Sequence, residues 1–209
     1  MPKTQRIGIY GGAFDPPHLA HEALAQAALD QYALDELRII PTGQAWHKSR
    51  SLSAAADRIA MAKLGFADVL KTCVDGRETL RSGPTYTYDT LQELKVENPN
   101  SELFLLMGED QLAFFPRWHR FEEILQIATL LVALRADSMP ATGQNAHINQ
   151  VKIAYSTIQM PASPISATQI RNMVRLLDAQ HPKLDHLVKP AVARYIVEHR
   201  LYRHSRRTH

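Results

Sequence analysis

The sequence predicts an α/β protein built on a parallel sheet, because two kinds of segment alternate along it. Short apolar runs that suit buried strands alternate along the chain with longer segments that have helical spacing. Helices that connect successive strands cover both faces of a sheet, and the strands between them then run parallel. With 209 residues, 45% of them hydrophobic, the chain can form a substantial core. We therefore expect a Rossmann-like, doubly wound sheet with a C-terminal helical part.

Each expected element follows from a stretch of consistent pattern. Strands are expected over residues 6–12, 36–43 (ending at Pro41), 69–76, 102–110, 129–136 and 151–160. Helices are expected over residues 18–34, 53–67 (with Ser53 as N-cap), 85–98, 121–128, 166–177 and 190–201, and a loop over 137–150. Because no repeat or linker is visible, we expect one domain over residues 1–209, with a helical segment at about 165–203 and a basic tail at 204–209.

The composition points to an ordinary cytoplasmic protein. No apolar run approaches the ~18 residues that a membrane helix needs, so no membrane partner is expected. The N-terminal stretch lacks the apolar core of a secretory signal, and the single cysteine, Cys73, excludes an internal disulfide. The net charge is only +3, and a solvated chain end explains the basic tail, so no nucleic-acid partner is expected. The sequence leaves a homo-oligomer open.

The junction between the first strand and the first helix concentrates unusual residues, "GGAFDPPHLAH". Gly11 and Gly12 let a ligand lie against the backbone, and the helix that follows directs its free N–H groups at the same space. His18 and His21 lie on one face of its first turn. Asp15 is expected to cap that helix or to hold the loop. Backbone and imidazole donors that converge in this way suit a phosphate, and the charge that develops on it during transfer.

A second candidate site follows about 145 residues later, in "ISATQIR". Ser166 and Thr168 supply hydroxyls at a helix start, and the Arg171 guanidinium follows within a turn. Such groups grip a polyphosphate, although an ordinary serine N-cap would explain Ser166 alone. A metal site at His18 and His21 is the weaker interpretation because no carboxylate or cysteine set completes it. No protein-built metal site is therefore expected.

These two stretches together resemble the signatures of the nucleotidyltransferase superfamily with the HxGH-type motif. Here that motif reads His18-Leu19-Ala20-His21, with alanine where glycine is commonest, and Ala13 replaces a common threonine. Three further stretches, "IPTGQAWHKS", "TYTYDTL" and "LLMGEDQLAFFPRWHRFEEI", are similar to the bacterial nicotinate-nucleotide adenylyltransferases. The resemblance covers nearly the whole chain, including the closing "PAVARYIVEHRLY".

The resemblance implies that ATP and nicotinate mononucleotide combine to give deamido-NAD and pyrophosphate. It implies an in-line attack by the mononucleotide phosphate on the ATP α-phosphorus, with no covalent enzyme intermediate. Catalysis would then consist mostly of positioning and charge stabilisation. The expected cofactor is Mg²⁺, bound mainly through the ATP phosphates.

The resemblance also implies a role for each matching residue. His18, His21 and Arg171 are the expected catalytic residues. ATP is expected to contact these three together with Gly11, Gly12, Ala13, Phe14, Gly108, Asp110, Ser166 and Thr168. Nicotinate mononucleotide is expected to contact Ala13, His47, Lys48, Tyr86, Thr87 and Trp118. Among these, Lys48 with His47 would hold its phosphate and Trp118 would face its base. Trp46 would cover the site.

Two alternatives stay open on the sequence. The first is a sister enzyme that uses nicotinamide mononucleotide or phosphopantetheine. The second is a non-catalytic protein on the same fold that binds nucleotides or RNA. The intact histidines and the intact "ISATQIR" disfavour the second alternative, and no aromatic RNA-stacking pattern is present.

Overall fold

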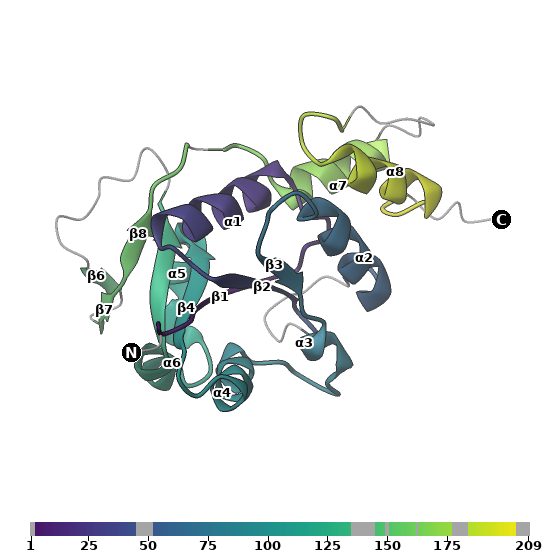
Figure 1. The fold of residues 1–209 in the computed structure, drawn as a ribbon. Coiled ribbons are helices and arrows are strands. Elements are labelled where there is room, and N and C mark those ends of the chain that lie inside the picture. Colours follow the sequence, from purple (N-terminus) through teal and green to yellow (C-terminus); the bar gives the residue numbers. More distant parts are fainter. Residues whose placement is uncertain are drawn as a thin grey trace.

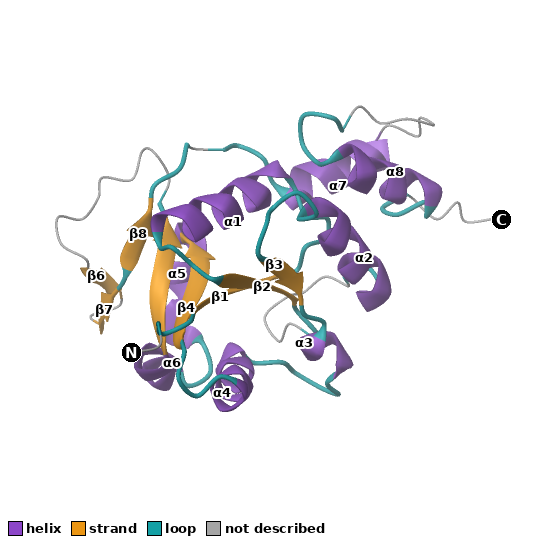
Figure 2. Ribbon diagram, in the orientation of Figure 1, coloured by secondary structure: helices purple, strands orange, loops and turns teal. Residues whose placement is uncertain are grey.

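The computed structural model describes residues 3–44, 52–134, 145–148, 151–161, 163–176 and 184–203. Its main element is a sheet of six parallel strands in the order β3-β2-β1-β4-β5-β8 (Figures 1 and 2). This confirms the predicted doubly wound, Rossmann-like class. The strand order reverses between β1 and β4, and ligands bind such sheets at the carboxyl ends of the strands beside that reversal.

The bounds of the elements follow the predicted ones closely. The strands are β1 (Arg6–Gly12), β2 (Glu36–Pro41), β3 (Thr72–Val74), β4 (Glu102–Gly108), β5 (Ala128–Ala133), β6 (Asn145–Ile148), β7 (Val151–Ala154) and β8 (Ser156–Ile158). The helices are α1 (Leu19–Gln31), α2 (Ala55–Gly65), α3 (Arg77–Leu80), α4 (Thr87–Glu97), α5 (Glu109–Phe114), the 3₁₀ helix η1 (Phe115–Arg117), α6 (Phe121–Ile127), α7 (Ala167–Leu176) and α8 (Pro190–Glu198).

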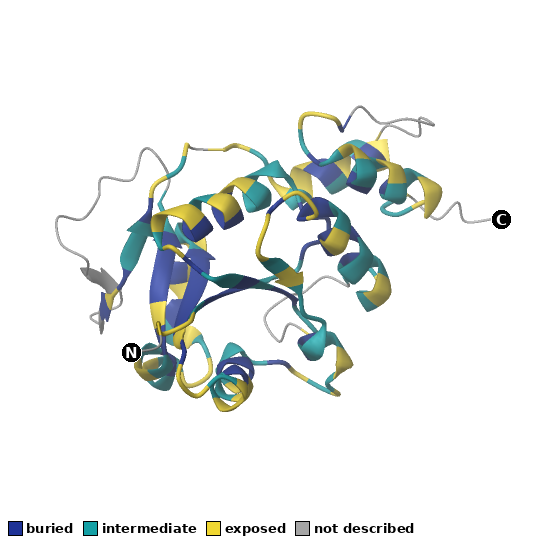
Figure 3. Cartoon of the chain, in the orientation of Figure 1, coloured by how far each residue is buried: buried dark blue, intermediate teal, exposed yellow. Residues whose placement is uncertain are grey.

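The central strands are buried on both faces because helices cover each of them. Along β1, Ile7 and Ile9 belong to a core that includes residues of α4 and α6. Tyr10 belongs to the opposite core, which includes residues of α1 and α2. Successive side chains of a strand point to opposite faces, so one apolar run fills two cores. The central strands are accordingly buried in Figure 3.

The structure corrects the prediction at several places. The strand expected over residues 69–76 is only Thr72–Val74, and the short helices α3, α5 and η1 were not predicted. The strand expected over residues 151–160 is divided: β7 pairs antiparallel with β6, and β8 alone joins the main sheet. β6 lies within the loop expected over 137–150. The strand expected over 102–110 ends at Gly108, which places Asp110 in the first turn of α5. Ala54, not Ser53, is the N-cap of α2, and the Ser53 N–H donates to the Asp15 carboxylate.

The C-terminal helices form a separate cluster against α2, away from the sheet (Figure 1). Val192 and Ile196 of α8 are fully buried there against Met61 of α2. Ile170 and Val174 of α7 complete the same cluster. This packing brings the second motif, at the start of α7, to the side of the molecule where β1 ends and α1 begins. None of the described helices is long and apolar enough to cross a bilayer.

We expect Ile196→Ala to lower the free energy of unfolding by about 2–5 kcal/mol, because it removes buried methyl groups and leaves a cavity. The measurement is urea denaturation of the full chain. Leu176→Ala is the control, since the Leu176 side chain is 81% exposed and its loss should change stability by less than about 0.5 kcal/mol. Equal effects of the two substitutions would contradict a packed C-terminal cluster.

Candidate active site

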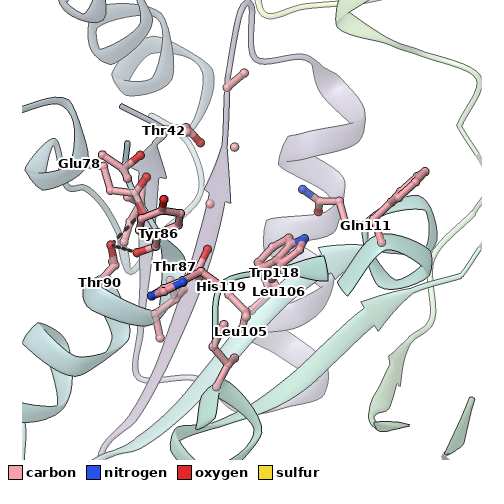
Figure 4. A pocket seen from close by; sticks show the side chains of 18 of the residues that line it. Thr42, Glu78, Tyr86, Thr87, Thr90, Leu105, Leu106, Gln111, Trp118 and His119 are labelled. Atoms are coloured by element: carbon pink, nitrogen blue, oxygen red, sulfur yellow. Dashed lines mark hydrogen bonds between the residues drawn. The ribbon is translucent and has the colours of Figure 1, made fainter. Parts of the chain in front are cut away.

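A cavity of about 570 Å³ opens beside the carboxyl ends of β1 and β4 (Figure 4). That size is within the ~300–1,000 Å³ of small-molecule sites. The end of β1 contributes Gly11, Gly12 and Ala13 to its wall. A Cβ on Gly12 would lie 2.9 Å from the Phe14 ring, so glycine is required there, whereas one on Gly11 would meet open space. The backbone of β1 is therefore directly accessible to a ligand.

The opposite wall combines aromatic rings with the start of a helix. Tyr86 is the N-cap of α4 and Thr87 is its first residue, so free N–H groups of the first turn lie at the cavity. Trp118 is half-buried, and its ring packs 5.4 Å from that of Phe115. The His119 ring lies 4.4 Å from the Tyr86 ring (Figure 4). A flat aromatic ligand with an acidic substituent fits these surroundings.

Glu78 is a pocket residue that sequence reasoning missed. It is buried, and the Thr90 hydroxyl donates to its carboxylate over 2.8 Å. Burial raises the pKa of Glu78, and the hydrogen bond from Thr90 opposes that shift. A Cβ on Gly43 would lie 2.1 Å from the Glu78 carbonyl oxygen, so this wall packs tightly against the loop after β2. A lone glutamate within "DGRETL" has no sequence signal that distinguishes it from a solvated one.

His18 and His21 lie together at the start of α1, as their spacing predicts. Their rings stack with centroids 3.6 Å apart and an interplanar angle of 20°. The backbone N–H of His18 donates to Nδ1 of His21 over 3.1 Å, so that nitrogen is an acceptor and the ring proton is directed to Nε2. The Phe14 ring contacts the His21 ring edge-on, at 5.3 Å. Packing and a hydrogen bond thus orient His21 before any ligand binds.

Burial makes His18 a neutral group at physiological pH. Desolvation lowers the pKa of His18 from 6.5 to about 4. Its Nδ1 atom is buried and has no hydrogen-bond partner within the described part of the chain. Buried polar atoms without partners are rare, and the one in His18 lies at the start of α1, directly after the loop that follows β1.

The second motif meets the first through its arginine. One Arg171 Nη atom donates to the Asp15 carbonyl over 2.8 Å, and the other donates to the Thr168 hydroxyl over 3.0 Å. The Ser166 hydroxyl accepts from the Gln169 N–H over 3.2 Å, so Ser166 does cap α7. Two segments that are 156 residues apart in sequence are therefore joined at one loop. Ser166 and Thr168 are exposed beside it.

The predicted site residues fall into four groups. The cavity wall includes Gly11, Gly12, Ala13, Tyr86, Thr87, Asp110 and Trp118. A second group lies outside that wall, near the α1 and α7 starts or at the end of β4: His18, His21, Gly108, Ser166, Thr168 and Arg171. Phe14 is core, 1% exposed with φ at 46°, so only its backbone can face a ligand. Trp46, His47 and Lys48 lie outside the described residues.

The described residues contain no group of three His, Cys, Asp or Glu side chains that could hold a metal ion. Asp15, three residues before His18, is buried and accepts hydrogen bonds from Tyr202 and Ser53, and Glu22, next to His21, pairs with Lys189. A divalent cation would therefore need most of its oxygen ligands from a bound polyphosphate.

Comparison with known proteins places the chain in a family. The model of the cytidylyltransferase-like family matches residues 9–173. A probable nicotinate-nucleotide adenylyltransferase of Albidiferax ferrireducens is 49% identical over 198 residues, which cover 95% of this chain and 98% of the relative. The chain belongs to the cytidylyltransferase-like family, and within it to the nicotinate-nucleotide adenylyltransferases. The resemblance recognised from the motifs is thereby confirmed.

Further members of the family agree. A probable nicotinate-nucleotide adenylyltransferase of Chromobacterium violaceum is 40% identical over 95% of this chain and 99% of the relative. Plasmodium falciparum nicotinic acid mononucleotide adenylyltransferase, in a structure complexed with NaAD, has a TM-score of 0.75 at 21% identity. That match covers 95% of this chain and 97% of the other, and it supports the fold.

His18 should make the stability of the ligand-free enzyme depend on pH. Its folded pKa, about 4, lies below the unfolded value of 6.5, so unfolding takes up a proton between these values. This contribution is complete above about pH 6.5 and is lost as the pH falls through about 4. Between pH 7 and pH 4.5, we expect the melting temperature of His18→Gln to fall less than that of the wild type. Parallel curves for the two proteins would contradict a buried neutral His18.

Proposed function

We propose that the chain joins ATP and nicotinate mononucleotide to give deamido-NAD and pyrophosphate. The hydrogen bond from Arg171 to the Asp15 carbonyl carries this proposal, because it unites the two anion-binding motifs. They meet next to a cavity of about 570 Å³ that suits a nucleotide base. The enzyme acts on small-molecule nucleotides, as expected for its family.

The two substrates fit two adjoining regions. The pyridine ring of the mononucleotide would stack on Trp118, with its carboxylate at the N–H groups that begin α4. The ATP phosphates would lie at the start of α1, between His18, His21 and the α7 motif. Gly11, Gly12 and Ala13 lie between the two regions and would let both phosphates approach the backbone. His47 and Lys48 would hold the mononucleotide phosphate.

The expected step is a single in-line displacement. A phosphate oxygen of the mononucleotide bonds to the ATP α-phosphorus while the bond from that phosphorus to the β-phosphate bridging oxygen breaks. Pyrophosphate leaves with the electron pair of that bond. Charge spreads over the α-phosphate oxygens in the transition state, and preorganised donors there lower the barrier. His21, whose ring is oriented with Nδ1 as acceptor, would direct its Nε2 proton at one of these oxygens.

The neutral state of His18 suits the same step. With a folded pKa of about 4, its imidazole is uncharged when the site is empty and can still donate one hydrogen bond. The Arg171 guanidinium would supply positive charge at the β- and γ-phosphates. Mg²⁺, held mainly by the phosphates, would neutralise charge on the departing pyrophosphate. Asp110, exposed in the first turn of α5, would reach a ribose hydroxyl.

We also propose that the enzyme is cytoplasmic and binds no nucleic acid. The single cysteine and the lack of a membrane-spanning helix in the described part of the chain are consistent with that location. A homo-oligomer is compatible with the surface but no feature of the site requires one. The basic tail at 204–209 lies outside the described residues.

Pyrophosphate release from ATP tests the proposed function. Nicotinate mononucleotide should support turnover well above the rates with nicotinamide mononucleotide and with phosphopantetheine. A preference for either other acceptor would assign the chain to a sister enzyme. No pyrophosphate release with any acceptor, together with RNA binding that persists at high salt, would favour the non-catalytic alternative.

His21→Ala should lower kcat by about 10²–10³, the loss typical of one donor to transition-state charge. Binding of the mononucleotide, measured by calorimetry, should change little because His21 does not line the base cavity. Gln26→Ala, on the exposed side of the same helix, is the control and should retain full turnover. A near-normal kcat for the His21 variant would remove it from the reaction.

Trp118→Ala should raise the KM for nicotinate mononucleotide about tenfold while the KM for ATP changes little, because a stacking aromatic contributes ~1–3 kcal/mol per base. Trp118→Phe retains an aromatic face and should recover most of that loss. Steady-state kinetics with each substrate varied in turn makes the measurement. Equal changes in both KM values would place Trp118 outside the base pocket.

A further inference from the structure

We propose that Tyr202 is a positioning residue for adenylyl transfer. Its hydroxyl, supplied by the turn after α8, holds the Asp15 carboxylate and so the loop that leads into His18 and His21 at the start of α1. The inference rests on the proposed function, since it concerns the geometry of the same phosphate site. It assigns a mechanistic role to the C-terminal end of the chain, where neither motif lies.

Asp15 is the point at which distant segments meet. It is 1% exposed and lies between Phe14 and the proline pair that precedes His18. The Tyr202 hydroxyl donates to one of its carboxylate oxygens over 2.7 Å, and the Ser53 N–H donates to the other over 3.3 Å. The Arg171 guanidinium donates to its backbone carbonyl. Three segments from elsewhere in the chain therefore hold one loop residue.

A second set of contacts holds the other side of the histidines. The backbone N–H of Leu19, the residue after His18, donates to the Leu187 carbonyl over 2.9 Å. Lys189, the residue before α8, pairs with Glu22 of α1 at 2.7 Å and with Asp68 at 2.8 Å. The C-terminal segment thus contacts the chain both before His18, through Tyr202, and after it, through Leu187 and Lys189. Such a segment restrains the position of α1 and of the loop together.

The backbone conformation of the turn after α8 determines the position of Tyr202. Arg200 and Tyr202 have φ angles of 52° and 64°, in the left-handed region that costs a non-glycine residue energy. The packed cluster of Val192 and Ile196 anchors the helix that leads into this turn. Burial and the neighbouring Asp15 carboxylate raise the pKa of Tyr202. Its hydroxyl therefore keeps its proton and remains a donor to Asp15 across the physiological range.

The kinetic consequence follows from where these contacts lie. None of Asp15, Tyr202, Leu187 and Lys189 lines the base cavity. Loosening the loop would shift the imidazoles relative to the ATP α-phosphate and leave the surface that binds the mononucleotide base in place. A misplacement of catalytic groups by about 1 Å can cost up to ~10² in rate. The loss is therefore expected in kcat, with the KM for the mononucleotide preserved.

Tyr202→Phe, which removes one oxygen atom, tests the proposal against a matched control. Tyr195 of α8 is also half-buried, and its hydroxyl also donates to a carboxylate, that of Asp57, over 2.9 Å. Tyr195→Phe therefore removes an equivalent hydrogen bond from the same C-terminal unit without touching Asp15. Thermal melts of both variants show whether each is folded at the assay temperature, and steady-state kinetics give kcat and both KM values.

We expect Tyr202→Phe to lower kcat about tenfold and to change the KM for nicotinate mononucleotide by less than about twofold. Tyr195→Phe should leave both parameters within about twofold of wild type and lower the melting temperature by no more than Tyr202→Phe does. Equal kcat values in the two variants would overturn the proposal, as would a raised KM with unchanged kcat in Tyr202→Phe. Absence of adenylyl transfer in the wild-type enzyme would instead refute the proposed function.

A double-mutant cycle tests whether Tyr202 acts through Asp15. Asp15→Asn keeps the shape of the side chain and removes its charge. If the hydroxyl works by holding this side chain, the kcat loss of the double variant should be smaller than the product of the two single losses. If the kcat loss of the double variant equals the product of the two single losses, Tyr202 acts independently of Asp15 and the proposal is overturned. This comparison uses variants that melt well above the assay temperature.

Discussion

The rest of the site depends on the restraint of the loop between β1 and α1. This loop lies at the carboxyl end of a central strand, where the order of the sheet reverses, and it leads into the two histidines that we propose to face the ATP phosphates. Its restraint comes from buried hydrogen bonds at Asp15 and from the Arg58 guanidinium, which donates to the Ala13 carbonyl over 3.1 Å. Side chains from α2, from α7 and from the turn after α8 thus restrain this loop.

This arrangement explains why the C-terminal helices pack where they do. They add nothing to the sheet, and their buried face meets α2 instead. By docking there they bring Arg171 and Tyr202 to the two sides of Asp15. The apolar cluster therefore has a consequence for the proposed site, because it sets the position of Arg171 relative to the loop that precedes His18.

The two halves of the site differ in physical character. The base cavity is formed by aromatic rings, a helix start and a tightly packed wall at Glu78, and its shape is determined by the core beneath it. The phosphate region is formed by backbone, imidazoles and a guanidinium at helix starts, where partial charges of the peptide groups favour anions. Burial leaves His18 uncharged, so in the proposed complex positive charge would come mainly from Arg171, the helix ends and the cation that accompanies ATP.

Local pattern in the sequence was sufficient for the fold class, for most of the helices and strands and for locating the two motif segments, because helix and strand periods, glycine pairs and hydroxyls at helix starts are short-range signals. A role for Tyr86, Thr87 and Trp118 in binding the mononucleotide was predicted only with the help of the family resemblance. Asp110 was assigned to a strand end because the apolar run gives no sign of where α5 takes over. Arg58 and Glu78 carried no signal at all, and Tyr202 lay only within the closing stretch that the family resemblance covers. Their burial and partners arise from contacts between segments far apart in the chain, and only the packing of the helices against one another decides which polar groups meet.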